Sequence, residues 1–359
     1  MNVVEATRSF ETWLAQRTEV VKKDLRLKHI KMKASVFPFL RATFYRWTQL
    51  WPQECPDLAK APRVLAVGDL HVENFGTWRD IEGRLIWGVN DFDEAFPLPY
   101  ANDLVRLAVS AHLAADAGRL NLKRTEICDA ILEGYLDGIR NGGAPFVLEE
   151  QNDWLRTIAL NDLRDPVRFW QKMEALPTAR GHVPGSAISA IEHLMPERAL
   201  DYRVANRIAG LGSLGHARYV ALANWNGGWI AREAKALAPS SCYWAADHHG
   251  PPGILYQTII THAVRCPDPF VRLRGHWIVR RLSPHCSRIE LSEVQASEMR
   301  LLHAMGSETA NIHLGTRRAA KHILRHARKQ KGKWLPAATQ AMLKRVIEDW
   351  NVWKEKGYE

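Results

Sequence analysis

Two short acidic segments in the first third of the chain carry residue types suited to phosphoryl transfer. The first, GDLHVENFG, follows an apolar run and places Asp69 and Asn74 five positions apart. Phosphoryl transfer needs a carboxylate beside the attacking hydroxyl and oxygen ligands for Mg²⁺. This spacing predicts Asp69 as a general base and Asn74 as a first Mg²⁺ ligand. His71, between them, is predicted as a catalytic-loop residue that orients Asp69.

The second segment, NDFDEA, offers Asp91 and Asp93 on either side of a phenylalanine that could anchor the loop in the core. We predict Asp91 as the second metal ligand, with Asp93 beside it. A plain turn is the alternative, because Asn and Asp side chains often only satisfy backbone amides. Two acidic loops after successive strands favour the metal site.

A glycine-rich segment, GLGSLG, lies far downstream between two predicted strands. The strand HARYVALANW follows it and runs into the hairpin signal Asn226-Gly227-Gly228. A strand, glycine flap and strand in this order are typical of a kinase small lobe, whereas the glycines of a Rossmann unit open a helix. An ordinary glycine-rich turn is the alternative. The predicted phosphate-binding residues of the flap are Gly210, Gly212, Ser213 and Gly215.

The next strand ends in REAKAL, which places Lys235 where a kinase-like lysine would contact the nucleotide phosphates. The following predicted helix, ILYQTIITHAVR, has no acidic residue to hold this lysine. Glu233 or Gln257 could take that place. Arg41 and Lys33, just upstream of the first acidic segment, are further candidates for contact with a substrate phosphate.

Taken together, these motifs resemble known families. GDLHVEN is similar to the GDxHxxN loop of aminoglycoside and choline phosphotransferases, and NDFDE is similar to their metal loop. The resemblance implies that Asp103, in PLPYANDLVRLA, supports both loops from the next helix. The whole set most closely resembles the bacterial domain of unknown function 2252 family, over about residues 28–315. The phosphotransferase resemblance implies a protein kinase-like fold that uses ATP and Mg²⁺, whereas the domain 2252 family conveys no established activity.

The order of the motifs predicts an α+β, two-lobed kinase-like fold that is circularly permuted, since the flap and lysine follow the catalytic and metal loops. Residues 1–202 would form the first part of a large helical lobe, with the two loops in residues 63–95. Residues 203–283 would form a small antiparallel β lobe, and residues 284–359 would complete the large lobe. Predicted strands include residues 273–282, and a helix is expected at about residues 254–265.

Composition leaves the partner open. The chain has 359 residues, a formal net charge of +10 and five scattered cysteines without a CxxC pair. No apolar run is long enough for a membrane helix or a signal peptide, so we expect a cytoplasmic protein without a membrane partner. Residues 317–333 hold eight Lys or Arg and no acid, which we interpret as a solvated helix face in preference to a nucleic-acid patch.

The leading hypothesis is an ATP- and Mg²⁺-dependent phosphotransferase whose acceptor, a small molecule or a protein, the sequence does not name. The alternatives are a catalytically silent nucleotide-binding regulator, a nucleotidyl (AMP) transferase and a basic nucleic-acid-binding protein.

Overall fold

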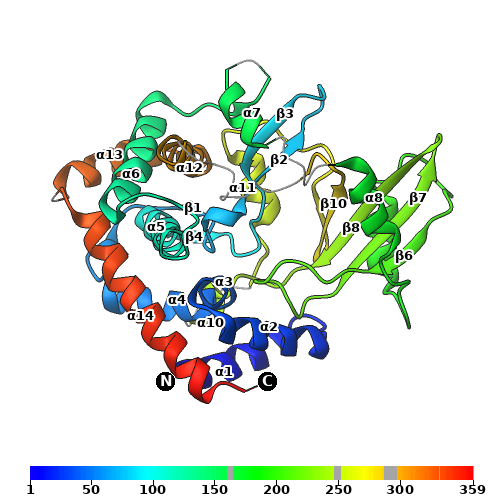
Figure 1. Ribbon diagram of the computed structural model, residues 1–359, viewed down its shortest axis with the longest axis horizontal. Helices are drawn as coiled ribbons and strands as arrows, with labels where there is room; N and C mark the ends of the chain where they lie inside the picture. The colour runs from blue at the N-terminus through cyan, green and yellow to red at the C-terminus, as the bar shows by residue number, and fades with distance from the viewer. Residues whose placement is uncertain (150, 160–164, 246–251, 287–296, 331, 359) are drawn as a thin grey trace.

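The computed structural model describes residues 1–149, 151–159, 165–245, 252–286, 297–330 and 332–358, and the description below concerns these residues. The fold combines many helices with three small antiparallel sheets, which confirms the predicted α+β class (Figure 1). Among the described residues, no helix combines the length and apolar character needed to cross a bilayer.

The chain begins with four helices that pack beside its last helix, α14 (Trp334–Lys356). They are α1 (Val3–Ala15), α2 (Lys22–Ala34), α3 (Val36–Ala42) and α4 (Phe44–Glu54). A buried ion pair between Arg46 Nε and Asp349 Oδ2, 2.7 Å long, joins α4 to α14. The two ends of the chain therefore lie close together at the same edge of the molecule (Figure 1).

Four short strands carry the two acidic loops. Strand β1 (Arg63–Ala66) pairs with β4 (Phe96–Pro99), and β2 (Phe75–Arg79) pairs with β3 (Leu85–Val89), which also pairs with β5 (Phe146–Val147). The strands predicted before each loop, β1 and β3, are present but belong to different sheets. Every residue of β3 is buried, as its continuous apolar sequence requires.

The helical part is built on α5 (Tyr100–Asp116), α6 (Arg124–Asn141) and α12 (Glu298–His313), with α7 (Asp153–Ala159) and α13 (Ala319–Lys329) at its edges (Figure 1). Helices α6 and α12 approach closely through two glycines. A Cβ on Gly134 would lie 1.9 Å from the His303 carbonyl oxygen, and one on Gly306 would lie 2.1 Å from that of Ile131. Any larger residue at either position would force the helices apart.

A five-stranded sheet forms a separate part of the chain, at the right of Figure 1. Its order is β6 (Arg203–Asn206), β7 (Arg218–Trp225), β8 (Gly228–Ala236), β10 (Trp277–Leu282) and β9 (Arg272–Arg274). The predicted tight turn between β7 and β8 is confirmed, with positive φ at Asn226 and Gly227.

Two predictions for this region need correction. Residues 273–282 do not form one strand, because Gly275 adopts a φ of +59° and turns the chain into the hairpin of β9 and β10. The helix expected at about residues 254–265 is shorter, α11 (Tyr256–His262), and it is preceded by the single turn α10 (Cys242–Ala245).

Two helices cover opposite faces of this sheet. Helix α9 (Gly185–Glu192) packs on the face that carries Ala221 and Ala234, and α8 (Pro166–Glu174) on the face that carries Val220. Neighbouring strand residues point to opposite faces, so Glu233 and Lys235 share the α8 face. Helices α8 and α9 precede residue 203 in the chain. The small β lobe of residues 203–283 and the other lobe boundaries stay a prediction.

Candidate active site

A glycine and a buried carboxylate shape the first acidic loop. Gly68 adopts a φ of +82°, and a Cβ there would lie 2.4 Å from the Glu94 carbonyl oxygen, so only glycine lets the two loops touch. Asp103, at the start of α5, accepts hydrogen bonds from the amides of Val67 (2.7 Å) and Gly68 (3.0 Å). His313 Nε2 lies 3.0 Å from the same carboxylate. Asp103 thus holds the loop just before Asp69, as the family resemblance implied.

Asp69 is held by Arg106, which the sequence had not singled out. Arg106 Nε donates to Asp69 Oδ1 at 2.9 Å, and its Nη2 contacts the same oxygen and also donates to the Leu40 carbonyl. The Arg106 side chain is fully buried against Phe44 and Trp47. Burial raises the pKa of Asp69, and Arg106 opposes that rise. The sequence did contain a signal for this contact, because Arg106 lies three residues after Asp103 and therefore on the same face of the helix.

The remainder of the loop forms a short 3-10 turn, η2 (Val72–Asn74). The Asn74 Oδ1 accepts the His71 amide at 2.6 Å, and His71 Nδ1 accepts the Glu73 amide at 3.1 Å. Arg41 Nε lies 3.2 Å from His71 Nε2. In the described structure it is Arg106 that contacts Asp69 with hydrogen bonds, so a catalytic or orienting role for His71 stays a prediction.

The second acidic loop docks directly on the first, because the Asn90 amide donates to the Asn74 carbonyl at 3.0 Å. Phe92 is buried and packs edge-on against Tyr256, as expected for an anchor. Asp91 keeps 40% of its side chain exposed, while both oxygens of Asp93 accept from Lys235 Nζ. The predicted ligands Asn74, Asp91 and Asp93 therefore come together.

These carboxylates differ in their affinity for protons. Asp91 is only partly buried, and Lys235 and a hydrogen bond with Asp93 outweigh the effect of that burial and lower the pKa of Asp91 to about 2. Burial and the neighbouring Asp91 raise the pKa of Asp93 to about 6. Glu94 accepts from Ser240 Oγ at 2.8 Å and from the Ser241 amide at 2.7 Å, yet burial raises its pKa to about 7. Asp91 is the member most readily ionised.

Lys235 does not pair with either partner suggested from the sequence. Its ammonium, only 2% exposed, bonds Asp93 and lies 3.6 Å from Asp91 Oδ1. Glu233 is occupied elsewhere: it is fully buried and accepts from three arginines, which hold its pKa well below the usual range against the effect of burial. These arginines are Arg207, Arg218 and Arg280. Gln257 accepts the Leu273 amide at 3.1 Å, away from the lysine. The second acidic loop therefore supplies the acidic partner of Lys235 that the predicted helix lacks.

The glycine loop, residues 210–215 between β6 and β7, lies over Asp69. A Cβ on Gly212 would lie 3.1 Å from the Arg41 carbonyl oxygen and 3.4 Å from Asp69 Oδ2. Lys28, from α2, donates to the Gly212 carbonyl at 3.2 Å, and the Val21 amide donates to Gly215 at 2.8 Å. The loop predicted to bind phosphates is thus fixed on the first acidic loop by the N-terminal helices.

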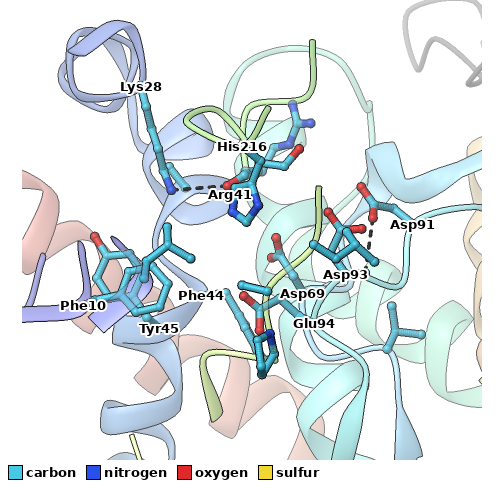
Figure 2. Close-up of a pocket in the computed structure, with 18 of the residues that line it drawn as sticks. Phe10, Lys28, Arg41, Phe44, Tyr45, Asp69, Asp91, Asp93, Glu94 and His216 are labelled. Atoms are coloured by element: carbon cyan, nitrogen blue, oxygen red, sulfur yellow. Dashed lines mark hydrogen bonds between the residues drawn. The ribbon is translucent and has the colours of Figure 1, made fainter. Parts of the chain in front are cut away.

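These groups enclose one hollow, which we call the carboxylate cavity. Figure 2 shows Asp69, Asp93 and Glu94 gathered on one side of it and Lys28 approaching from the other. The cavity encloses about 70 Å³. Its polar lining comprises Lys28, Arg41, Asp69, Asn74, Asp91, Asp93, Glu94, Gly212, Ser213 and His216. Arg41 is present as anticipated, whereas Lys28 and His216 had not been foreseen.

His216 is held as a neutral imidazole at the end of the glycine loop. Its Nδ1 lies 3.0 Å from the Ala236 carbonyl oxygen, so Nδ1 carries the proton and Nε2 keeps a free lone pair. Burial, reinforced by Lys28 and Lys235, lowers its pKa to about 3.

Among the described residues, no three His, Cys, Asp or Glu side chains converge as a metal-binding group. A metal here would therefore rest on few protein ligands.

Comparison with known proteins bears on the first half of this site. Residues 19–187 match the DUF2252 family. This family is described as an uncharacterized protein conserved in bacteria, and the match confirms the predicted resemblance to this family, over residues 19–187 and not as far as residue 315. The matched segment holds both acidic loops, Asp103 and Arg106, whereas the glycine loop and Lys235 lie beyond it. No curated protein and no solved structure matches the chain.

Proposed function

We propose that this protein is an ATP- and Mg²⁺-dependent phosphotransferase in which Asp69 is the general base. One observation carries the proposal. Gly212 and Ser213 of the glycine loop line one cavity with Asp69, Asn74 and Asp91, and Lys235 bonds Asp93 in its wall, although well over a hundred residues separate the two groups.

The residues present fit a magnesium ion bound together with phosphate. Mg²⁺ usually takes one or two carboxylates, several waters and substrate phosphates, and it does not need a cage made wholly of protein ligands. Asp91 supplies an exposed, ionised carboxylate, and the Asn74 side chain lines the same cavity. When bound, the ion would neutralise charge on the phosphates.

The chain's own groups would position the acceptor and move its proton. Arg106 fixes one oxygen of Asp69, which leaves Oδ2 beside the glycine loop to accept the proton of an acceptor hydroxyl. The hydroxyl oxygen then bonds to the terminal phosphorus, the bond from that phosphorus to the bridging oxygen breaks, and ADP leaves. The raised pKa of Asp69 favours proton uptake.

The succession of elements in residues 203–282 supports the kinase-like interpretation. A glycine loop joins the first two strands, Lys235 is on the third, and helix α11 follows, which is the order of these parts in a kinase small lobe. Phosphoryl transfer depends on where groups lie in space, so the swapped chain order is compatible with the same chemistry. The adjacent chain ends fit a circular permutation.

Substrate binding requires the glycine loop to lift. At about 70 Å³ the carboxylate cavity holds a few waters but is far below the roughly 300 to 1,000 Å³ of ligand pockets. The Lys28 and Val21 contacts would have to open first. We therefore propose the described state as the closed form of the site.

The decisive experiment follows labelled ATP. Incubation with Mg²⁺ and a metabolite extract should move a γ-phosphate label to an acceptor in the wild type but not in Asp91→Asn. Mg²⁺ and ATP together should also raise the melting temperature more than the sum of either alone, and Asp91→Asn should lose this excess. Transfer of an α-phosphate label with release of pyrophosphate would assign AMP transfer instead. Bound nucleotide without any transfer would indicate a silent regulator.

The basic segment gives a second, weaker candidate. Helix α13 buries Ala319 and Ile323 and turns its basic side chains to a groove shared with Lys60 and Arg63. This groove could bind a nucleic-acid backbone. Such binding would weaken steeply with salt, and its absence at low salt would remove the nucleic-acid hypothesis.

A further inference from the structure

A second, larger hollow lies on the other side of the metal loop, and we call it the arginine cavity. It measures about 480 Å³, within the range of roughly 300 to 1,000 Å³ that small-molecule sites occupy. Asn90 and Phe92 line it, whereas Asp91 and Asp93 line the carboxylate cavity. Its charged lining is five arginines and one acid: Arg207, Arg265, Arg272, Arg280, Arg281 and Asp268.

Two of these arginines already have an acidic partner. Arg207 and Arg280 both pair with the buried Glu233, Arg280 at 2.8 Å. Asp268 is occupied by the Phe270 amide at 2.9 Å. Arg265, Arg272 and Arg281 form no ion pair among the described residues, so the positive charge that remains for a ligand rests on these three.

Arg265 carries the strongest indication of an anion-binding site. Its guanidinium stacks on Trp78 and Phe92, 4.5 and 5.2 Å from the ring centroids. Its Nη1 is buried and has no hydrogen-bond partner among the described residues. A buried N–H of a charged group that finds no acceptor is costly, so such a group marks a place for a ligand.

The nearest acid does not remove this need. Glu308 lies close enough to Arg265 to affect its charge, but the Glu308 oxygens accept from the Val89 amide at 3.1 Å and from Asn311 at 2.8 Å. Burial raises the pKa of Glu308 to about 7, so its negative charge is only partial near neutral pH. Glu308 is an incomplete counterion for Arg265.

Arg281, on strand β10, repeats the pattern. It stacks on Phe270 at 4.3 Å and donates from Nη2 to the Arg79 carbonyl at 3.3 Å. Its Nε is buried without a partner in the described part of the chain. The same cavity thus contains two stacked guanidinium groups with open donors, together with the aromatic side chains of Trp78, Phe92 and Tyr256.

We propose that the arginine cavity binds a phosphorylated small molecule, with Arg265 and Arg281 on its phosphate groups and the aromatic side chains against its organic part. Guanidinium forks suit phosphate oxygens in geometry and charge, and the cavity walls exclude water that would weaken the contact. The ligand's phosphate end would lie beside the metal loop. The inference rests on the proposed function only where it concerns the identity of the substrate in the cavity. The anion site itself is argued from Arg265 and Arg281 alone.

Inorganic pyrophosphate, added without Mg²⁺ and with a chelator present, is the probe that tests the site. We expect it to bind the wild type and raise its melting temperature. Arg265→Met and Arg281→Met should each weaken binding about tenfold to a hundredfold, the effect of losing charged hydrogen bonds. Arg265→Lys should weaken it less than Arg265→Met. Arg274→Met, on the exposed edge strand β9 and outside the cavity, is the matched control and should bind as the wild type does.

Two further measurements separate this site from the proposed function. Asp91→Asn should keep metal-free pyrophosphate binding even if every transferase activity is absent. If ATP and pyrophosphate compete, the arginine cavity binds the donor nucleotide. If they bind at the same time, the cavity binds a phosphorylated acceptor. Either outcome supports a phosphate site in this cavity. Failure of the folded wild type to bind pyrophosphate, or equal binding by folded Arg265→Met and Arg281→Met variants, would overturn it.

Discussion

The carboxylate cavity and the arginine cavity lie back to back, yet they are built for opposite charges. One gathers Asp69, Asp91, Asp93 and Glu94 beneath a glycine loop, and the other gathers five arginines between β10, α11 and β2. The first is nearly closed at about 70 Å³, while the second is open at about 480 Å³. We infer that the reacting groups meet in the carboxylate cavity and that the arginine cavity supplies binding energy for the substrate.

A single loop creates this division. Between β3 and β4, Asn90 and Phe92 line the arginine cavity, and Asp91 and Asp93 line the carboxylate cavity. The side chains of this segment alternate between the two cavities, so one short loop presents acids to one side and an anchor ring to the other. A metal bound at Asp91 would then lie at the boundary between donor and acceptor.

The largest expected effect separates chemistry from binding. Asp69→Asn removes the general base but keeps an oxygen for Arg106, so turnover should fall roughly 100-fold to 10,000-fold. Metal-free pyrophosphate binding should not change, because Asp69 does not line the arginine cavity. Steady-state kinetics and calorimetry measure the two quantities. Asp129→Asn, exposed on α6, is the control, and unchanged turnover in Asp69→Asn would remove the base from its role.

The next effect concerns the buried acid behind the arginines. Glu233→Gln leaves the guanidinium groups of Arg207, Arg218 and Arg280 without a counterion, so the free energy of unfolding should fall by about 3 to 5 kcal/mol. Chemical denaturation checks this value. Exposed Glu82→Gln should change stability by less than about 0.5 kcal/mol. A similarly small loss in Glu233→Gln would show that solvent already screens the cluster.

A third effect is a pH dependence confined to the carboxylate cavity. Burial raises the pKa of Glu94 to about 7 in the folded chain, above its ordinary 4.5. The folded state therefore favours the protonated acid, and this stabilisation is present at low pH and lost as pH rises through about 7. As pH rises from about 5 to about 8, the wild type loses this stabilisation and Glu94→Gln does not, so the melting temperature of the variant should rise relative to that of the wild type. Exposed Glu133→Gln is the control, and its melting temperature should depend on pH as that of the wild type does. The same pH dependence in Glu94→Gln would contradict the buried-acid interpretation.

The smallest effect probes the lid of the carboxylate cavity. Gly212→Ala places a methyl group 3.1 Å from the Arg41 carbonyl oxygen and 3.4 Å from Asp69 Oδ2. Tight contacts of this kind cost about 1 kcal/mol or slightly more, so we expect a small loss of stability and a severalfold loss of turnover. Gly228→Ala, which meets no atom within 4 Å, is the control. Wild-type turnover in Gly212→Ala would mean that the loop does not lie over the reacting groups.

Local sequence signals predicted much of the scaffold. The spacing of Asp69 and Asn74 placed a loop after β1, and Asn226-Gly227 predicted the turn between β7 and β8 because both residues tolerate positive φ. The support of the loop by Asp103 also followed, from the family resemblance. The hairpin of β9 and β10 was missed because Gly275 was interpreted as part of a continuous strand.

Partners across long stretches of chain could not be predicted in this way. The sequence by itself determined which segments bend, which residues are buried in β3, and which acids and glycines are available for chemistry. Only the tertiary structure decided that Lys235 bonds Asp93, that Arg106 holds Asp69, and that arginines from residues 207 to 281 share one cavity. The physical reason is that turn and strand preferences act between neighbours in the chain, whereas a buried charge takes as its partner whichever counterion the packing brings within reach.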